Sequence, residues 1–486
     1  MILVLLIVIL LIGGTLCWLL SKWNKLLPRW IALCATVACL TLTIWLGSQF
    51  KDGGTGGEWF INYRLNWIPS FGISFHLALD GLSLVLLLLT FFLGILSVLC
   101  SWNEIKEKHG FYFFNLLWTL AGICGVFVAM DLFLFYFFWE VMLVPMYFLI
   151  SVWGDTNRRY ASYKFFLFTQ AGGLLMLLSI LALYFIHAQQ TGIYSFDYFD
   201  LLHTSPEASA AKWIMMGFLI AFMVKLPVVP FHSWLPDAHS EAPTAGSLIL
   251  AGLLLKTGAY GIIRFVLTLF PQQAQAFAWW AMLLGAIGIL YGAFLAFAQT
   301  DLKRLIAYTS VSHMGFVLLG IFAFNEIAMQ GVIMQILTHG ISTGALFIMA
   351  GMLKERLHTR DINQMGGLWT ALPLMGGAAM VFTMASLGLP MLGNFIAEFL
   401  ILIGAFSVNV ALTVLATLGL IFSACYALRM MQKVFLGPAT TTVPLKDLNV
   451  REWVMMSALT IGIIVLGLFP QPVIDMVNGV VRGLVD

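Results

Sequence analysis

The stretch AFMVKLPVVPFHSWLP (residues 221–236) is an apolar segment broken by proline, and MASLGLPMLGNFIAEFL (residues 384–400) is a second one. Proline inside a helix removes a backbone hydrogen bond and clashes with the preceding turn. In a membrane, such a break persists only where protein or water satisfies the freed backbone groups. The two segments therefore predict discontinuous membrane helices that line an interior pathway. A pair of kinks without function is the alternative.

The whole chain has the composition of a membrane protein. Of its 486 residues, 61% are apolar and 9% are charged, whereas about a quarter of a soluble domain is charged. A helical span needs about 20 apolar residues. Fourteen segments are long enough, near residues 2–20, 30–48, 81–100, 111–129, 132–152, 163–186, 212–230, 245–269, 277–298, 304–323, 326–352, 371–404, 411–435 and 453–470. We therefore predict an all-α integral membrane protein with about 14 transmembrane helices, the seventh and twelfth discontinuous.

The distribution of lysine and arginine predicts the orientation of these spans. Loops that follow odd-numbered spans hold sixteen such residues, and loops that follow even-numbered spans hold two, Lys51 and Arg64. Because basic loops stay in the cytoplasm, we expect both termini on the outer side. The first twenty residues have no cationic lead-in and no cleavage site, so they are expected to be a retained span rather than a signal peptide.

The two breaks, at Pro227 and Pro390, lie five spans apart. Broken helices at corresponding places in two equivalent units are typical of transporters built from repeats.

The connections differ from the spans in composition. Residues 49–79, with Gly53, Gly54, Gly56 and Gly57, are expected to be an exposed loop, and residues 187–211 the other long polar connection.

Four ionisable residues lie inside apolar segments: Glu140, Lys225, Lys256 and Glu398. Each costs about 2.5–3.5 kcal/mol at mid-membrane on insertion scales. An ion pair in a low-dielectric interior is a weak stabiliser, so stability is a poor reason for four of them. A lysine whose carboxylate partner can approach or withdraw is a switchable proton site. The set therefore favours a proton relay over structural pairing.

Four histidines could extend this relay. His313 and His339 lie inside the tenth and eleventh spans, and His232 and His239 follow the first break. Imidazole passes protons near neutral pH, so the first two are candidates for a polar line and the last two for its entrance. A hydrogen-bonded histidine at a helix interface is the alternative. Other charged residues have simpler roles: Lys212 and Arg264 are expected to snorkel to an interface, and Asp80 and Asp131 to cap helices or lie at an interface.

Several classes of partner and cofactor find no support in the sequence. The net charge of +2 offers no basic patch for nucleic acid. The six cysteines form no CxxC pair, and iron–sulfur clusters need grouped thiolates. The glycine-rich pieces lack a phosphate-binding pattern. We therefore expect no cofactor and no metal in this chain.

Five strings together resemble one family, the antiporter-like proton-pumping subunits of respiratory complex I (NADH:quinone oxidoreductase). They are FWEVMLVPMYFLI, VKLPVVPFHSWLPDAHSEAPTAGS, LLKTGAYGIIRF, AQTDLKRLIAYTSVSHMGF and GNFIAEF. The resemblance implies two inverted five-helix repeats, spans 4–8 and 9–13. It divides the chain into residues 1–110 with helices 1–3, residues 111–270 and 271–436 with the repeats, and residues 437–486 with helix 14.

The resemblance also implies roles for the buried residues. Glu140 and Lys225 would form the coupling pair of the first repeat, Lys256 the central relay and Glu398 the terminal site of the second. His313 and His339 match positions of the polar axis.

Protons would move from the cytoplasm to the outside of a bacterial inner membrane. The flavin, iron–sulfur clusters and quinone of the complex would belong to partner subunits, which would include two further antiporter-like subunits. A subunit of a multi-chain sodium/proton antiporter, one of an energy-converting hydrogenase or formate-linked complex, and a purely structural spacer are the alternatives.

One departure from the family lies at the second break. The family usually has Leu-Pro-Gly or Met-Pro-Gly there, whereas this chain has Leu389-Pro390-Met391. Glycine adopts positive φ without steric cost. The local geometry at Met391 is therefore the point where this chain is expected to differ.

Overall fold

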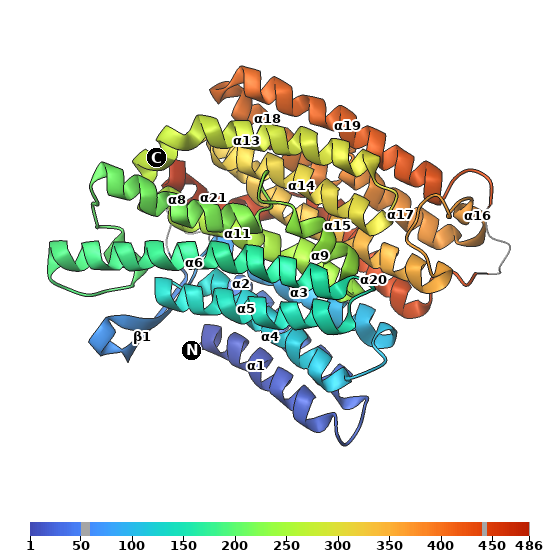
Figure 1. The fold of residues 1–486 in the computed structure, drawn as a ribbon, viewed down its shortest axis with the longest axis horizontal. Coiled ribbons are helices and arrows are strands. Elements are labelled where there is room, and N and C mark those ends of the chain that lie inside the picture. Colours follow the sequence, from blue (N-terminus) through green and yellow to red (C-terminus); the bar gives the residue numbers. More distant parts are fainter. Residues whose placement is uncertain (50–58, 440–444, 486) are drawn as a thin grey trace.

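The computed structural model describes residues 1–49, 59–439 and 445–485 as a bundle of long, roughly parallel helices (Figure 1). Thirteen of the described helical segments are long and apolar enough to cross a membrane, and two shorter ones, Pro373–Ser386 and Gly393–Val408, form the broken twelfth span. Fourteen crossings follow, as predicted. The start of α1, the end of the chain and the strand β1 lie at the same end of the bundle (Figure 1).

Up to the first break, the described residues form eight α-helices and two strands. These are α1 (Ile2–Leu20), α2 (Leu27–Gln49), β1 (Ile61–Ile68), β2 (Ile73–Leu79), α3 (Gly81–Glu104), α4 (His109–Val128), α5 (Leu132–Trp153), α6 (Arg158–Thr191), α7 (Tyr198–Leu201) and α8 (Ala208–Lys225), followed across the first break by α9 (Trp234–Glu241). A short 3-10 turn, η1 (Pro69–Phe71), joins the strands. The eighth span combines α10 (Thr244–Ile249), the π-helical turn η2 (Leu250–Leu254), α11 (Leu255–Gly261), the π-helical turn η3 (Ile262–Val266) and α12 (Leu267–Leu269).

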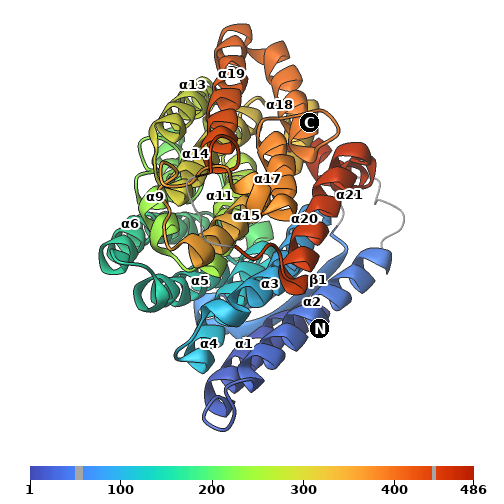
Figure 2. The ribbon, with the colours of Figure 1, turned by 90° about the vertical axis from the view of Figure 1, so that its right-hand side faces the viewer.

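The second part consists of helices in the region that the structure describes. They are α13 (Pro271–Ala298), α14 (Leu302–Ile321), α15 (Glu326–Leu357), α16 (Leu368–Ala371), α17 (Pro373–Ser386), α18 (Gly393–Val408), α19 (Val410–Val434), α20 (Val450–Leu468) and α21 (Gln471–Val485). Viewed along the helices, α15 and α3 are central, α1 and α4 lie at one edge, and α13 and α19 lie at the opposite edge (Figure 2).

Two spans are buried along their whole central window: the eighth, Thr244–Leu269, and the eleventh, α15. α15 contacts α14, α17, α18, α20 and the start of the eighth span. A helix that is apolar all round is a buried helix. Polar side chains on these two spans therefore face protein rather than lipid, which is the setting that a relay needs.

The break in the seventh span is confirmed. α8 ends at Lys225, and residues 226–233 are not helical before α9 begins. The freed carbonyl of Val224 accepts a hydrogen bond from Trp234 Nε1 at 2.9 Å. Trp234 is fully buried. A side chain from the second half of the span thus satisfies the backbone of the first half, as a membrane interior requires.

The break in the twelfth span is also confirmed, between the end of α17 at Ser386 and the start of α18 at Gly393. Gly388 has φ of 79° and Met391 has φ of 78°. Both residues therefore lie in the left-handed region, where a side chain is disfavoured. The turn keeps a conformation suited to glycine although Met391 stands there.

The expectation of an exposed loop at residues 49–79 is wrong in two respects: residues 61–79 form a strand hairpin, and residues 73–79 are mostly buried, whereas β1 is largely exposed. β1 and β2 form an antiparallel hairpin, and β2 is mostly buried. Met130 N donates to His76 O at 2.9 Å, so the hairpin pairs with the chain between α4 and α5. The sequence of β2 alternates apolar residues with Ser74, His76 and Ala78, which is the pattern of a strand, although both of its faces are buried. The glycines at positions 53, 54, 56 and 57 lie outside the described residues.

The chain after the fourteenth span forms a further helix, α21, which is not among the predicted spans. Its side chains contact the start of α15: Asn478 Oδ1 accepts from Gln330 Nε2 at 3.0 Å, and Arg482 Nε lies 3.5 Å from Glu326 Oε1. The helix is amphipathic, which is why an analysis restricted to continuous apolar segments does not find it.

Candidate functional site

Lys256 is the fully buried centre of the site. It lies on α11, between the π-helical turns η2 and η3. Such wide turns are rare and occur often at functional sites. Its ammonium group donates to the carbonyl of Ala251, five residues earlier, with an Nζ–O distance of 2.5 Å. The wide turn therefore offers a backbone acceptor to the amine.

The second partner of Lys256 is His339 on α15, with 2.6 Å between Nζ and Nδ1. The other ring nitrogen, Nε2, has no hydrogen-bond partner among the described residues. The centroid of this ring lies 5.6 Å from that of His313 on α14. Both histidines predicted for a polar line therefore lie next to each other, and one of them contacts the lysine.

His313 connects this line to the second break. Its Nδ1 lies 2.9 Å from Glu398 Oε1, and its Nε2 lies 3.1 Å from Ser386 Oγ, the last residue of α17. Gln335 Nε2 also donates to Glu398 Oε1, at 3.2 Å. We call Lys256, His339, His313 and Glu398 the central line. Its members come from four spans. Side-chain contacts join Lys256 to His339 and His313 to Glu398, and a gap separates the rings of His339 and His313.

The two charged residues of the first repeat are arranged differently. Lys225 is fully buried at the end of α8, and its Nζ has no hydrogen-bond partner in the described part of the chain. The amine lies 5.3 Å from the ring centroid of Trp139 and 5.4 Å from that of Phe165. Glu140 is only partly buried, and its Oε1 accepts from Gln170 Nε2 at 3.4 Å.

Glu140 and Lys225 thus form no ion pair within 4.0 Å in the residues described, although each lies within electrostatic range of the other. The cation is held by aromatic faces, which attract it through their quadrupoles. Charge at Glu140 therefore acts on Lys225 across a gap.

His232 and His239, predicted for an entrance, form no hydrogen bond with the central line among the described residues. His239 is fully buried on α9 and stacks on Phe347 with 4.6 Å between the ring centroids. Neither of its ring nitrogens has a partner within the described ranges. His232 is nearly buried and packs edge-on against Tyr291 at 5.2 Å.

Several residues at the site escaped the sequence analysis. Gln335 could have been found, because it precedes His339 by four positions and so shares its helix face. Ser386 and Tyr426, whose hydroxyl lies 3.4 Å from His313 Nε2, offer no signal in the sequence. Lys303 lies between the predicted spans 277–298 and 304–323, yet it is buried at the start of α14.

The interpretation of Arg264 is wrong, since the side chain is buried and forms an ion pair with Asp80. It does not snorkel, because a carboxylate on a neighbouring span neutralises it inside the bundle. Asp80 also caps α3 by accepting from Ser83 N, as expected. Asp131 caps α5 in the same way, accepting from Phe133 N and Leu134 N.

Within residues 1–49, 59–439 and 445–485, no group of three or more His, Cys, Asp or Glu side chains is placed to hold a metal ion. The chemistry that the central line offers is proton transfer, since an imidazole can accept a proton on one nitrogen and release one from the other.

Known proteins share both the sequence and the fold. The model of the family described as NADH:quinone oxidoreductase/Mrp antiporter, TM, matches residues 129–423. NADH-quinone oxidoreductase subunit M of Pseudomonas aeruginosa is 52% identical over 100% of this chain and 97% of its own length. The subunit of that name from Escherichia coli is 50% identical over 97% of this chain and 95% of its own length.

Solved structures agree with this assignment. A chain of the respiratory complex I from Thermus thermophilus with bound NADH matches with a TM-score of 0.89 and 30% identity over 100% of both chains. A chain of the Mrp complex from Dietzia sp. matches with a TM-score of 0.88 at 22% identity over 100% of this chain and 97% of its own, which shows the shared fold alone. The chain therefore belongs to the NADH:quinone oxidoreductase/Mrp antiporter family of membrane subunits, in its complex I subunit M branch.

Proposed function

We propose that this chain is a proton-translocating membrane-arm subunit of NADH:quinone oxidoreductase. It carries protons from the cytoplasm to the outside of a bacterial inner membrane, and quinone reduction in other subunits drives the transfer. The observation that carries the proposal is the central line, whose contacts run from Lys256 through His339 and His313 to Glu398. Such a series has no need to exist in a purely structural spacer.

Transfer along the line uses ordinary acid–base steps. An ammonium at Lys256 gives its proton to His339 Nδ1, and the ring releases a proton from Nε2. The proton crosses to His313, whose Nδ1 lies beside the Glu398 carboxylate. Glu398 then holds it beside the twelfth-span break, where the helix interruption provides polar backbone groups.

Glu140 and Lys225 are the coupling pair in this proposal. Lys225 is buried with aromatic rings as its neighbours, so its charge depends strongly on whether Glu140 is ionised and how close it lies. A change at Glu140 therefore alters the charge at the seventh-span break. That change is transmitted to Lys256 electrostatically, because interactions in a low-dielectric interior reach further than in water.

We also propose that a neighbouring membrane subunit covers the face of α5 and α6 around Glu140. The carboxylate is partly exposed in the middle of a span, beside the exposed side chains of Phe137 and Val144. Against lipid, such a charge is costly.

Two further antiporter-like subunits are the partners expected in the membrane arm, and the flavin, iron–sulfur clusters and quinone belong to other subunits. Lipid is the remaining partner, and both termini lie on the outer side.

Substitution of Lys256 tests the proposal in the intact complex. In membrane vesicles, Lys256→Met should lower NADH-driven proton pumping by about tenfold or more, because a positioned acid–base group contributes ~10²–10⁴-fold. Lys433→Met, which removes an exposed cation from α19, is the matched control. Full pumping in an assembled Lys256→Met complex would contradict the proposal. Cation exchange that requires neither NADH nor quinone would favour the antiporter alternative.

A further inference from the structure

Two arginines at the end of the bundle opposite the hairpin lack an anionic partner. Arg29 lies in the first turn of α2 and Arg451 in the first turn of α20, and both are half-buried. Nε of each, and Nη1 of Arg451, are buried without a hydrogen-bond partner among the described residues. Neither side chain has a carboxylate within 4.0 Å in the part of the chain that the structure describes. Because arginine stays charged in proteins, each is a permanent cation without a counter-charge.

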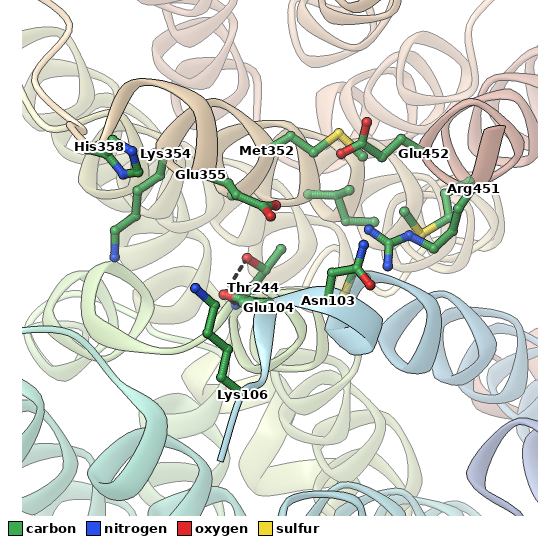
Figure 3. Close-up of a pocket in the computed structure, with 14 residues that line it drawn as sticks. Asn103, Glu104, Lys106, Thr244, Met352, Lys354, Glu355, His358, Arg451 and Glu452 are labelled. Atoms are coloured by element: carbon green, nitrogen blue, oxygen red, sulfur yellow. Dashed lines mark hydrogen bonds between the residues drawn. The ribbon is translucent and has the colours of Figure 1, made fainter. Parts of the chain in front are cut away.

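The two arginines meet at the end of α3, which contacts both α2 and α20. The guanidinium carbon of Arg29 lies 5.9 Å from the ring centroid of Trp102 on α3. Arg451 points toward the next residue of that helix, Asn103 (Figure 3). Arg29 is within electrostatic range of Arg451. Since like charges repel, an anion bound between the two would stabilise both.

The carboxylates near Arg451 do not supply that anion. Arg451 lines a cavity of about 260 Å3 together with three acids. Glu104 is held by two hydrogen bonds from the first residue of α10, and Glu452 forms an ion pair with Arg356 at 2.6 Å. Glu355 lies on the other side of the cavity, apart from Arg451 (Figure 3). Buried N–H groups of native proteins usually have an acceptor, so the missing acceptor is expected from outside the chain.

The cationic surface continues from Arg29 toward the start of α4. Nδ1 of His109 has no partner in the described residues, and this ring lies within electrostatic range of Arg29 and Lys25. A second cavity, of about 520 Å3, is lined by Lys25, Lys108 and His109 and by no carboxylate. We call Lys25, Arg29, His109 and Arg451 the basic patch. Its composition suits a ligand of net negative charge.

Exposed tryptophans next to the basic patch indicate where it lies relative to the membrane. Trp30 follows Arg29 directly and is 54% exposed, and Trp453 follows Arg451 by two positions and is 53% exposed. Tryptophan is enriched at the boundary between lipid and water. Further along the same helices, the exposed side chains include Val37 and Ile461, which are apolar. The basic patch is therefore at the level of lipid head groups, above a surface that suits acyl chains.

We propose that Arg29 and Arg451 bind the phosphate of a phospholipid of net negative charge, in the membrane leaflet at this end of the bundle. Guanidinium groups bind phosphate oxygens through paired, charge-assisted hydrogen bonds. Basic pockets between spans on one side of a membrane are typical sites for anionic head groups. Because both side chains are only half-buried, the phosphate reaches them from the membrane surface. A zwitterionic head group binds less well, since its own cation meets a patch that already has an excess of positive charge.

Photolabelling of the intact, purified complex in lipid vesicles tests this site. The probes are a phosphatidylglycerol and a phosphatidylcholine that carry the same photoreactive acyl chain, and mass spectrometry maps the labelled peptides. We expect phosphatidylglycerol to label the first turns of α2 and α20 about fivefold or more above phosphatidylcholine. Equal labelling by the two probes would show an apolar contact without head-group recognition and would overturn the inference. Absence of labelling at these peptides would overturn it as well.

Substitution of the arginines provides a second measurement. Arg29→Gln combined with Arg451→Gln should lower the phosphatidylglycerol labelling by about fivefold or more. Lys433→Gln, which removes an exposed cation from α19 at the opposite edge of the bundle, is the matched control and should leave it unchanged. Equal labelling in both variants would exclude the arginines as the binding groups. If the arginine variant does not assemble, the comparison of the two lipids in the unsubstituted complex decides.

A competition experiment separates a lipid from a soluble anion. Inorganic phosphate in millimolar excess should leave the phosphatidylglycerol labelling in place, because the acyl chains contribute to lipid binding. Displacement of the label by phosphate alone would assign the basic patch to a soluble anion and overturn the proposal of a lipid. The readout is labelling and not proton pumping, so either result leaves the proposed function untouched.

Discussion

The imidazole of His313 lies with Nδ1 2.9 Å from Oε1 of Glu398, and this contact joins α14 to the second half of the broken twelfth span. It places an acid and a base side by side where both are nearly fully buried. Because the same ring also contacts Ser386 on the first half of that span, His313 connects both sides of the break. The relation makes Glu398 the natural end of the central line.

Replacement of Glu398 by glutamine should therefore stop transfer at this end. Glu398→Gln keeps the size of the side chain and a hydrogen bond to His313, but removes the proton-accepting carboxylate. We expect NADH-driven pumping to fall by about tenfold or more while the complex assembles. Glu107→Gln, at an exposed carboxylate between α3 and α4, should leave pumping unchanged. Equal pumping by both variants would show that Glu398 carries no protons.

The bond from Trp234 to the Val224 carbonyl should stabilise the seventh-span break. Trp234→Phe leaves that buried carbonyl without its partner, at a cost of about 1–3 kcal/mol. We expect a lower unfolding temperature for the detergent-solubilised complex. Trp213→Phe, at a side chain that is 74% exposed, is the matched control. If both variants unfolded at the same temperature, the bond would contribute nothing at the break.

The contacts of Asp155 should make stability depend on pH near the acid limit. Burial raises the pKa of Asp155, but its hydrogen bond to Lys354 and the charges of Lys354 and Arg360 outweigh this effect and lower the pKa overall. A lowered pKa gives stability that is present above the unfolded value of about 3.9. That stability is lost as the pH falls through the folded value.

Asp155→Asn should therefore destabilise the complex at pH 7 by about 0.2–1 kcal/mol, the range for partly exposed pairs. The difference from the unsubstituted chain should vanish as the pH falls below about 4. Thermal unfolding over a pH series measures both quantities. A difference that stayed constant down to pH 3 would assign the effect to something other than this carboxylate.

Met391 should be a point of strain that glycine relieves. Its φ of 78° costs about 1–2 kcal/mol for a residue with a side chain, so Met391→Gly should raise the unfolding temperature. Met391→Ala keeps the β-carbon and should bring no such gain. The side chain is 64% exposed, and loss of its packing is therefore a small effect. A stabilisation by alanine as large as that by glycine would exclude backbone strain as the cause.

The spans and the titratable residues could be predicted from the sequence because each leaves a local signal. Lys256 and Glu398 stand out as charges within apolar segments, and Pro227 and Pro390 mark the breaks within a few residues of where the helices stop. These features can be recognised because a charge or a proline is energetically costly in lipid. That cost depends on the local segment and not on which helices are its neighbours.

What escaped prediction depends on which helices are neighbours. The position of Arg264 near the end of an apolar segment is typical of a snorkelling residue. The side chain is instead a buried partner of Asp80, because η3 packs near the start of α3. Lys303 is the second residue of α14, directly after a short loop. It is buried because α9 and α10 cover it. Likewise both faces of β2 are mostly buried, although its alternating sequence is typical of a half-exposed strand. Such facts belong to the assembled bundle rather than to any single segment.

The two wide turns that flank Lys256 have a mechanical consequence. Each π-helical turn contains one residue more than an α-helical turn can accommodate, and each helical residue corresponds to a rotation of roughly 100°. Moving that surplus residue past the lysine would swing its amine around the axis and exchange its acceptor, while both ends of the span stayed anchored. The two π-helical turns thus allow a local rotation within the eighth span. Such a rotation would redirect the Lys256 side chain without displacing a helix through the bilayer.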